Sequence, residues 1–404
     1  MSGSKVKLAL VGCGYISAGH IRGYRNLFEH GCDAFEISAC CDVSKDAAEA
    51  CAAQIGELQG SKPAVFDSVE GLTAAGAAEA ADVCVPHCFH HSVAIPLLEA
   101  GLHVLLEKPL GITMAAGRAI IAAAEKHGRI LSTAENIRRG LSARAARWAL
   151  SEEKMIGDVR HVDVQMISHG QFDYSKPLFK WRGVKLLTGG GMIMDSGAHF
   201  TDMMLYLFGE PDTVWAEVRT LEAIAIEDVP VVGRAAADVE DEWLAVLKFR
   251  CGTRVLWAYN RVQPGSSLNT GYYYGTRGTM ECLGNKFHAF QDGGRIVLDG
   301  GAEHSREWIE EQYRASLSAD RREALFPWGV TEGIAVEIGE FVRAVRTGAK
   351  VEMDGRAGQR AKALSIACYE SSLAGEPASY ADVLEGRIDA YQRPINEYWG
   401  IGVT

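Results

Sequence analysis

The sequence lacks any hydrophobic run long enough to cross a membrane. A spanning helix needs about 20 predominantly apolar residues, and the most apolar stretch, residues 97–106, is interrupted by Glu99 and His103. The first residues lead directly into an apolar strand pattern, without the basic flank, apolar core and small-residue cleavage site of a secretory signal. We therefore expect a soluble cytoplasmic protein with no membrane partner.

The sequence also lacks an excess of positive charge. Its formal net charge is −11, and a net acidic surface repels phosphate backbones, which argues against nucleic acid as a partner. An anionic dinucleotide remains compatible, because local backbone dipoles can hold it. The 10 cysteines form no spaced framework, so we expect buried, reduced thiols, as in a cytosolic protein.

The first third of the chain alternates short apolar runs with helical patterns. Such alternation predicts an α/β domain with a doubly wound parallel sheet and right-handed crossovers. We expect this Rossmann domain over residues 1–137. Strand patterns occupy residues 6–11, 37–41, 81–85, 103–106 and 129–134, and helical patterns occupy residues 17–29, 44–55, 91–100 and 114–126.

Near residue 155 the pattern changes to the alternation of half-exposed antiparallel strands. We expect an α+β domain over residues 138–380, with a large open-faced, mostly antiparallel sheet that has helices on one face. A tail, residues 381–404, should pack back on the protein. Expected strands are 159–168, 213–219, 242–249, 253–260, 270–276, 279–283 and 295–298, and expected helices are 334–346 and 355–374.

A glycine-rich turn links the first strand to the first helix. Gly12 permits a tight turn, and Gly14 lets the backbone approach a pyrophosphate, whose charge the helix N-terminus stabilises. Tyr15 and Ile16 complete the loop, and the small Ser17 takes the third position of the motif. A strand–turn–helix without a ligand is the alternative.

Asp42 ends the second strand and indicates the choice of cofactor. A carboxylate there accepts hydrogen bonds from the adenosine ribose hydroxyls and repels a 2′-phosphate, so NAD is favoured over NADP. Lys45 keeps NADP open as the less favoured cofactor. The alternative for Asp42 is a helix N-terminal carboxylate that local amides satisfy.

Three further motifs make the chain resemble the Gfo/Idh/MocA family, that of glucose–fructose oxidoreductase and inositol dehydrogenase. The motifs are Val-Pro-His-Cys-Phe-His at 85–90, Glu-Lys-Pro at 107–109, and a triple glycine at 189–191 before Asp-Ser-Gly-Ala-His at 195–199. The resemblance runs from residue 5 to about residue 379. It implies a Rossmann domain, an open-faced sheet domain, and NAD(P)-dependent oxidation or reduction of sugars, cyclitols or similar polyols.

Lys108, Asp195 and His199 are the candidate catalytic residues. An imidazole exchanges protons near neutrality, so we assign proton transfer to His199, and Lys108 can stabilise developing alkoxide charge. If residues 194–208 form a helix, Asp195 and His199 share one face, and Asp195 binds a substrate hydroxyl or orients the imidazole. The resemblance implies that all three line the substrate site. The alternatives are a surface His–Asp pair and a strand end closed by Pro109.

The resemblance also implies residues around the cofactor and the substrate. Pro86 and His90 would lie in a loop beneath the nicotinamide, and Glu107, Lys108 and Pro109 beside it, often with a cis peptide before the proline.

On the substrate side, the resemblance points to Asn136, Trp181 and Arg182. An aromatic ring with an adjacent guanidinium suits stacking on a sugar ring and binding its hydroxyls. The alternatives are a turn residue at 136 and a packed Trp181 with an exposed Arg182. Residues 284–328 are long and aromatic for a connection, so we expect a cover over the active site or an oligomer contact.

The segment 87–91 holds three histidines and a cysteine. Its spacing is too tight for a structural zinc site, so we expect no metal.

The leading hypothesis is an NAD-dependent dehydrogenase that acts on a secondary ring carbinol of a sugar, glycoside or cyclitol, in a homo-oligomer. A keto-sugar reductase, an enzyme that recycles a tightly bound NAD(H), and an NAD-binding sensor or assembly protein remain as alternatives.

Overall fold

The computed structural model describes residues 5–170 and 172–402, which divide into two compact units. The first unit runs up to Arg139 and includes residues 319–359, and the second holds residues 140–318 and those from Arg360 onward. The sequence placed the first boundary at residue 137, two residues away. It assigned residues 319–359 to the second domain, whereas they group with the first unit.

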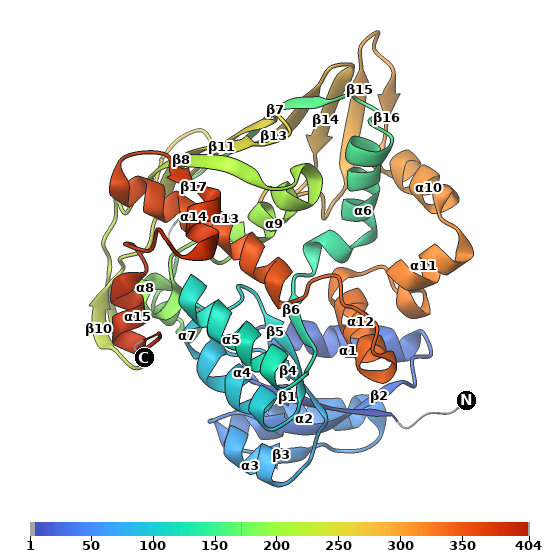
Figure 1. Ribbon diagram of the computed structural model, residues 1–404, viewed down its shortest axis with the longest axis vertical. Helices are drawn as coiled ribbons and strands as arrows, with labels where there is room; N and C mark the ends of the chain where they lie inside the picture. Colours follow the sequence, from blue (N-terminus) through green and yellow to red (C-terminus); the bar gives the residue numbers. More distant parts are fainter. Residues whose placement is uncertain (1–4, 171, 403–404) are drawn as a thin grey trace. The chain divides into compact units, whose positions relative to one another are not determined.

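A parallel sheet of six strands forms the centre of the first unit (Figure 1). The strand order is β3-β2-β1-β4-β5-β6, and every neighbouring pair is parallel. This is the predicted doubly wound topology, whose strand order reverses between β1 and β4. The strands are β1 Val6–Val11, β2 Phe35–Cys41, β3 Ala64–Phe66, β4 Ala80–Val83, β5 His103–Glu107 and β6 Leu131–Ala134.

Helices pack on this sheet, and one of them explains why residues 319–359 join the first unit. A Cβ atom at Gly23 of α1 would lie 2.9 Å from Ile338 Cδ1 of α12, so the glycine allows these two helices to approach closely. The helices are α1 Ser17–Glu29, α2 Lys45–Gln59, α3 Val69–Ala74, α4 His90–Glu99, α5 Met114–Lys126, α11 Ala319–Leu325 and α12 Gly333–Thr347.

A mixed sheet of nine strands forms the second unit, in the order β16-β15-β14-β13-β7-β12-β11-β8-β17. In the part of this sheet that the structure describes, only β7 and β12 pair in parallel, so the prediction of a mostly antiparallel sheet is confirmed. The strands are β7 Val159–Ile167, β8 Pro211–Arg219, β11 Glu242–Phe249, β12 Arg254–Asn260, β13 Leu268–Gly275, β14 Gly278–Cys282, β15 Gly294–Leu298, β16 Glu303–His304 and β17 Ala378–Ser379.

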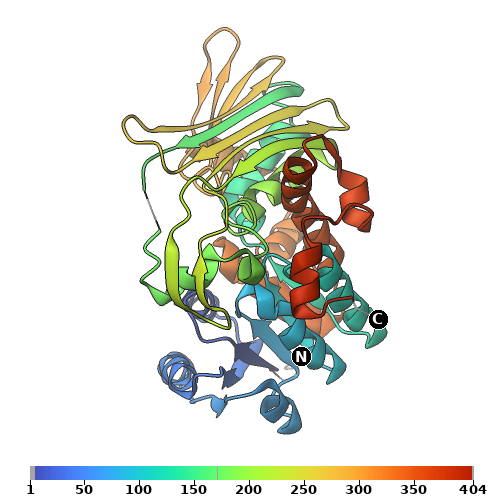
Figure 2. The same cartoon turned by 90° about the vertical axis from the view of Figure 1, so that its left-hand side faces the viewer.

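One face of this sheet is covered by helices, including α6 and α9 (Figures 1 and 2). Trp243 and Trp257 are buried, whereas Leu244, which alternates with Trp243 along β11, is exposed. The unit also contains a small sheet of β9 Ala225–Val229 and β10 Gly233–Ala236. Its helices are α6 Leu141–Arg147, α7 Pro177–Lys180, α8 Lys185–Thr188, α9 Gly197–Phe208, α10 Arg306–Ser316, the later part of α13 Gly355–Ala374, α14 Tyr380–Glu385 and α15 Arg393–Trp399.

The tail returns to the second unit, where the indole N–H of Trp399 donates to the Leu186 carbonyl over 2.6 Å. Between residues 5 and 402, residue 171 apart, no helix is long and apolar enough to span a membrane.

Candidate active site

The glycine turn after β1 is shaped by the end of β4. Gly12 has a φ of +90°, and a Cβ atom there would lie 2.8 Å from the Cys84 carbonyl group, so only glycine suits the position. A Cβ atom at Gly14 would meet nothing within 4 Å. The first turn of α1 carries no acidic side chain, and no side chain caps it at Ile16. Backbone N–H groups beside open space fit a pyrophosphate, and Tyr15, the next residue along the chain, is exposed.

Asp42 lies directly after β2 and is hydrogen-bonded to this turn. Its Oδ2 accepts the Cys13 N–H over 2.7 Å, and its Oδ1 accepts the Ser44 N–H over 2.8 Å. The carboxylate thus accepts one neighbouring amide and one amide of the glycine turn, and the N-cap of α2 is Ser44 rather than Asp42. Each oxygen has a second lone pair, so these bonds are compatible with accepting a ribose hydroxyl.

The loops after β4 and β5 are joined by His90. Its Nδ1 lies 2.9 Å from the Pro109 carbonyl oxygen, and its Nε2 lies 3.0 Å from the Val85 carbonyl oxygen. Burial lowers the pKa of His90 to about 3, so the ring is neutral at physiological pH and donates its one proton to one of these carbonyls. Because the side chain is fully buried, it can act on a cofactor loop only through the backbone it supports.

Lys108 emerges at the end of β5 beside a buried carboxylate. The Lys108 N–H donates to Glu107 Oε2 over 2.9 Å, and the Lys108–Pro109 peptide is cis, as the resemblance implied. Because the carboxyl ends of parallel strands meet at one edge of a sheet, the glycine turn, Pro86 and Lys108 emerge from the same edge. Asn136 follows β6 at this edge, and its carbonyl oxygen accepts the Arg139 N–H over 3.2 Å.

In the second unit, a buried carboxylate that the sequence did not predict accepts hydrogen bonds from the triple-glycine loop. Glu240 accepts the Gly191 N–H over 2.8 Å, the Ile193 N–H over 2.7 Å and the Tyr369 hydroxyl over 2.9 Å. A Cβ atom at Gly190 would lie 2.2 Å from the Tyr369 hydroxyl oxygen. The loop before His199 therefore needs glycine.

The prediction of a helix over residues 194–208 is wrong at its start. Helix α9 begins at Gly197, and Asp195 lies in the preceding turn, with its N–H donating to the Gly191 carbonyl over 3.0 Å. Asp195 and His199 thus do not share a helix face. Asp195 Oδ2 instead accepts a hydrogen bond from Arg182 Nε over 2.9 Å, and the Arg182 guanidinium lies 4.4 Å from the Trp181 ring centroid. These three predicted substrate residues are together.

His199 is buried on α9 and has a second histidine beside it. The rings of His199 and His288 lie with centroids 4.9 Å apart at 89°. His288 belongs to the long segment 284–328, most of which folds as strands and helices, and it was not predicted. A histidine within a long aromatic segment was its only sequence signal.

The predicted catalytic residues are divided between the units. Lys108 is held by the first unit, and Asp195 and His199 are held by the second. In segment 87–91, His90 has both ring nitrogens occupied by protein carbonyls and packs against His87. Each of its ring nitrogens thus faces a protein carbonyl oxygen within hydrogen-bond distance.

A Rossmann unit with an open glycine turn, an acidic residue after β2 and a lysine after β5, followed by an open-faced sheet, defines a nicotinamide-dinucleotide oxidoreductase. Residues 6–135 match the family model described as "Oxidoreductase family, NAD-binding Rossmann fold", and residues 144–281 match the GFO/IDH/MocA C-terminal domain. The chain belongs to the Gfo/Idh/MocA oxidoreductase family. The predicted family, fold and NAD cofactor are confirmed.

Named relatives act on sugars. The chain is 29% identical over 182 residues to the levoglucosan dehydrogenase of Pseudarthrobacter phenanthrenivorans, which covers 42% of this chain and 46% of that one. It is 25% identical over 262 residues to the D-glucoside 3-dehydrogenase of Escherichia coli, which covers 64% and 70%. The chain thus spans about half of the first relative and somewhat over two thirds of the second.

Solved structures share the fold along nearly the whole chain. Levoglucosan dehydrogenase in complex with NADH and levoglucosan has a TM-score of 0.73 and 20% identity, and the match covers 93% of this chain and 100% of that chain. The WlbA dehydrogenase from Bordetella pertussis, in complex with NADH and UDP-GlcNAcA, has a TM-score of 0.70 and 23% identity, with 93% and 99% covered. At these identities the likeness shows the fold alone.

Proposed function

We propose that this protein transfers a hydride between NAD and a secondary ring carbinol of a sugar, glycoside or cyclitol. The observation that carries the proposal is that the open glycine turn after β1 and Lys108 after β5 emerge from one edge of one parallel sheet. Ligands of doubly wound sheets bind at this edge. The relatives named for levoglucosan and D-glucosides support a cyclic polyol as the substrate.

The side chains supply the proton chemistry and the positioning. When bound, NAD+ accepts the hydride. Oxidation of the carbinol breaks its C–H and O–H bonds, and the imidazole of His199 takes the hydroxyl proton. The Lys108 ammonium donates a hydrogen bond to the reacting oxygen and stabilises its developing negative charge. Asp195, held by Arg182, binds neighbouring hydroxyls. The proposal requires Lys108 and His199 to act on the same carbinol.

A substrate screen tests the reaction in both directions. Purified protein is incubated with NAD+ and a panel of monosaccharides, glycosides, anhydrosugars and cyclitols, and the absorbance of NADH is followed. The reverse reaction is tested with NADH and the corresponding keto sugars, because one relative is named 1,5-anhydro-D-fructose reductase. Turnover of at least one ring substrate is expected. No turnover in either direction, with the cofactor shown to bind, would favour a sensor or assembly protein.

Mass spectrometry of the purified protein separates an exchanging dehydrogenase from a self-recycling enzyme. Stoichiometric NAD(H) that survives purification would indicate recycling on one substrate. We expect a protein that exchanges its cofactor and loses it on dilution.

The proposal includes a cytoplasmic homo-oligomer. Leu244 and Tyr274 are exposed on strands β11 and β13 of the large sheet, and an apolar surface of that kind favours burial against a second copy. Nine of the 10 cysteines are buried and all are free thiols, which suits a reducing compartment. Light scattering of wild type and of Leu244→Lys tests the contact, with dissociation of the variant as the expected result.

A further inference from the structure

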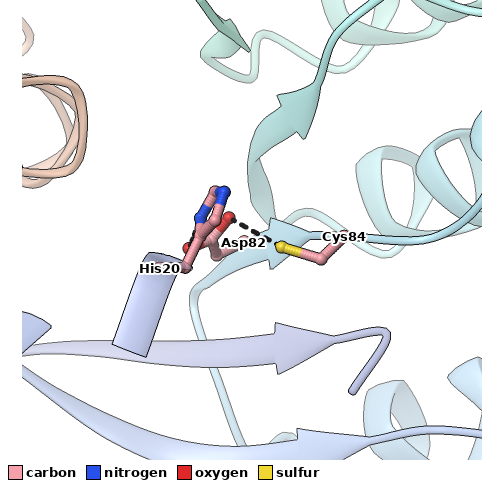
Figure 3. Close-up of side chains that lie close together, drawn as sticks. All are labelled: His20, Asp82 and Cys84. Carbon is pink, nitrogen blue, oxygen red and sulfur yellow. Dashed lines mark hydrogen bonds and ion pairs between the residues drawn. The ribbon is translucent and has the colours of Figure 1, made fainter. Parts of the chain in front are cut away.

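A histidine is enclosed between two carboxylates inside the first unit. His20 lies on α1, on the buried side that also carries Ile21, Tyr24 and Leu27. Its Nδ1 lies 2.8 Å from Asp82 Oδ2, and its Nε2 lies 3.0 Å from Glu107 Oε1. His20 and Asp82 are fully buried, and Glu107 is 8% exposed. Figure 3 shows the ring against Asp82 at the end of β4.

The geometry determines how many protons these groups share. A neutral imidazole has one N–H and one bare nitrogen, so it would turn a lone pair towards one of the two carboxylates. Both contacts are satisfied only if the ring carries two N–H groups or a carboxyl group is protonated. Although burial opposes the charged ring, the Asp82 carboxylate raises the pKa of His20 well above its ordinary value. The doubly protonated ring is therefore favoured.

The groups around the ring agree with a buried cation. Asp82 Oδ2 also accepts the Tyr24 hydroxyl over 2.5 Å. On α12, burial raises the pKa of Glu337 well above its ordinary value, and Arg139 pairs with this residue over 3.3 Å. The negative charge that favours a positive charge on His20 therefore comes from the two carboxylates that the ring contacts, Asp82 and Glu107.

Among residues 5–170 and 172–402, the group that could hold a metal ion is His20, Asp82 and Cys84, whose ligand atoms all lie within 4.8 Å of one another. A cysteine binds metal as its thiolate. Burial raises the pKa of the Cys84 thiol to about 12, and its Sγ donates to Asp82 Oδ1 over 3.9 Å. The thiol therefore stays neutral, and the hydrogen bonds described above satisfy the cluster without a cation other than the ring itself.

The chain of contacts leads directly to the candidate catalytic lysine. Glu107 binds His20 with Oε1 and accepts the Lys108 N–H with Oε2. The orientation of the Glu107 carboxylate is thus set by the ring on one side and the lysine backbone on the other. A change at His20 would release Glu107 and with it the turn that carries Lys108.

We propose that His20 is a positioning residue for Lys108: as a buried imidazolium it ties Glu107 to Asp82 and holds the turn on which the lysine acts. The inference rests on the proposed function for its kinetic consequence only. The protonation of the ring and the link to Glu107 belong to the first unit and can be measured without a substrate.

The first experiment is NMR of protein labelled with 15N-histidine, with His20→Gln to assign the resonance. We expect both ring nitrogens of His20 to carry protons at pH 7 and at pH 8. A singly protonated ring at pH 7 would overturn the proposal. Elemental analysis accompanies it, and one bound metal ion per chain would overturn it in favour of a metal site.

The second experiment measures kinetics once a substrate is known. His20→Gln is expected to lower kcat by about 10- to 100-fold, the effect of a small misplacement of a catalytic group, with the Kd for NADH within about twofold. Glu107→Gln, whose amide oxygen can still accept from the ring, should retain more activity than Glu107→Ala. A folded His20→Gln protein with wild-type kcat would refute the positioning role. An inactive wild type with a doubly protonated ring would refute only the proposed reaction.

Discussion

The imidazole ring of His288 meets that of His199 edge to face, with the ring centroids 4.9 Å apart. An edge-to-face contact limits rotation of the buried ring, and His288 is itself held by Gln291, whose Oε1 lies 2.9 Å from its Nδ1. His288→Asn is therefore expected to lower kcat about 10-fold by loosening His199. His30→Asn, a change of an exposed histidine, is the matched control. Equal kcat values for the two variants would show that His288 does not position His199.

Substitution of Lys108 or His199 should reduce catalysis without weakening cofactor binding. Lys108→Met removes the cation at the reacting oxygen, and His199→Ala removes the proton acceptor, so each should reduce kcat/KM by about 100-fold or more. The Kd for NADH, measured by fluorescence titration, should change by less than about threefold. Full activity in either variant would contradict the roles assigned here.

Substitution of the two glycines of the cofactor turn should affect different properties, stability at Gly12 and NADH affinity at Gly14. Gly12→Ala places a methyl group 2.8 Å from the Cys84 carbonyl group at a φ of +90°, and we expect it to lower the free energy of unfolding by about 2 kcal/mol or more. Gly14→Ala meets no protein atom within 4 Å, so it should fold normally but bind NADH more weakly. Thermal denaturation and NADH titration distinguish the outcomes. Normal NADH affinity in Gly14→Ala would show that the pyrophosphate does not bind at this turn.

Asp42 should control the choice between NAD and NADP. Its carboxylate carries the negative charge that a 2′-phosphate would meet, so Asp42→Ser is expected to increase the NADPH-to-NADH affinity ratio about 10-fold or more. Asp46→Ser, a change in the exposed first turn of α2, is the control. An unchanged ratio in Asp42→Ser would place the adenosine ribose elsewhere.

His90 should make the protein sensitive to acid. Burial lowers its folded-state pKa to about 3, whereas an unfolded histidine titrates near pH 6.5. Between these values the unfolded chain binds a proton that the native state does not, so stability falls as pH decreases, by up to about 1.4 kcal/mol per pH unit from this residue. Urea unfolding of His90→Asn between pH 7 and pH 5 should show a smaller slope than wild type. Parallel slopes would contradict the neutral buried ring.

The regular parts of the fold were predictable because their patterns are local. The strand at residues 6–11 and the helix at residues 17–29 have the expected bounds, since burial on both faces and helical periodicity are visible in single segments. Strand β3 has three residues, too few to show a period, and was missed. The helical pattern of 334–346 was recognised, but its membership of the first unit depends on the close approach to Gly23.

Some residues of the candidate site could likewise be predicted from local patterns, and others could not. Lys108 and Asp42 follow predicted strands, so the sequence could point to them, although their roles remain predictions. Glu240 and His288 have no motif around them. Their importance comes from contacts with Gly191 and His199, which lie far away along the chain.

By itself, the sequence determined the order of strands and helices, the glycine turn and the residue types that can move a proton, because these depend on neighbours along the chain. Only the tertiary structure decided the charge of His20. Its two carboxylate partners lie 62 and 87 residues away, and a protonation state follows from the groups that surround a side chain in space, whatever their distance in sequence.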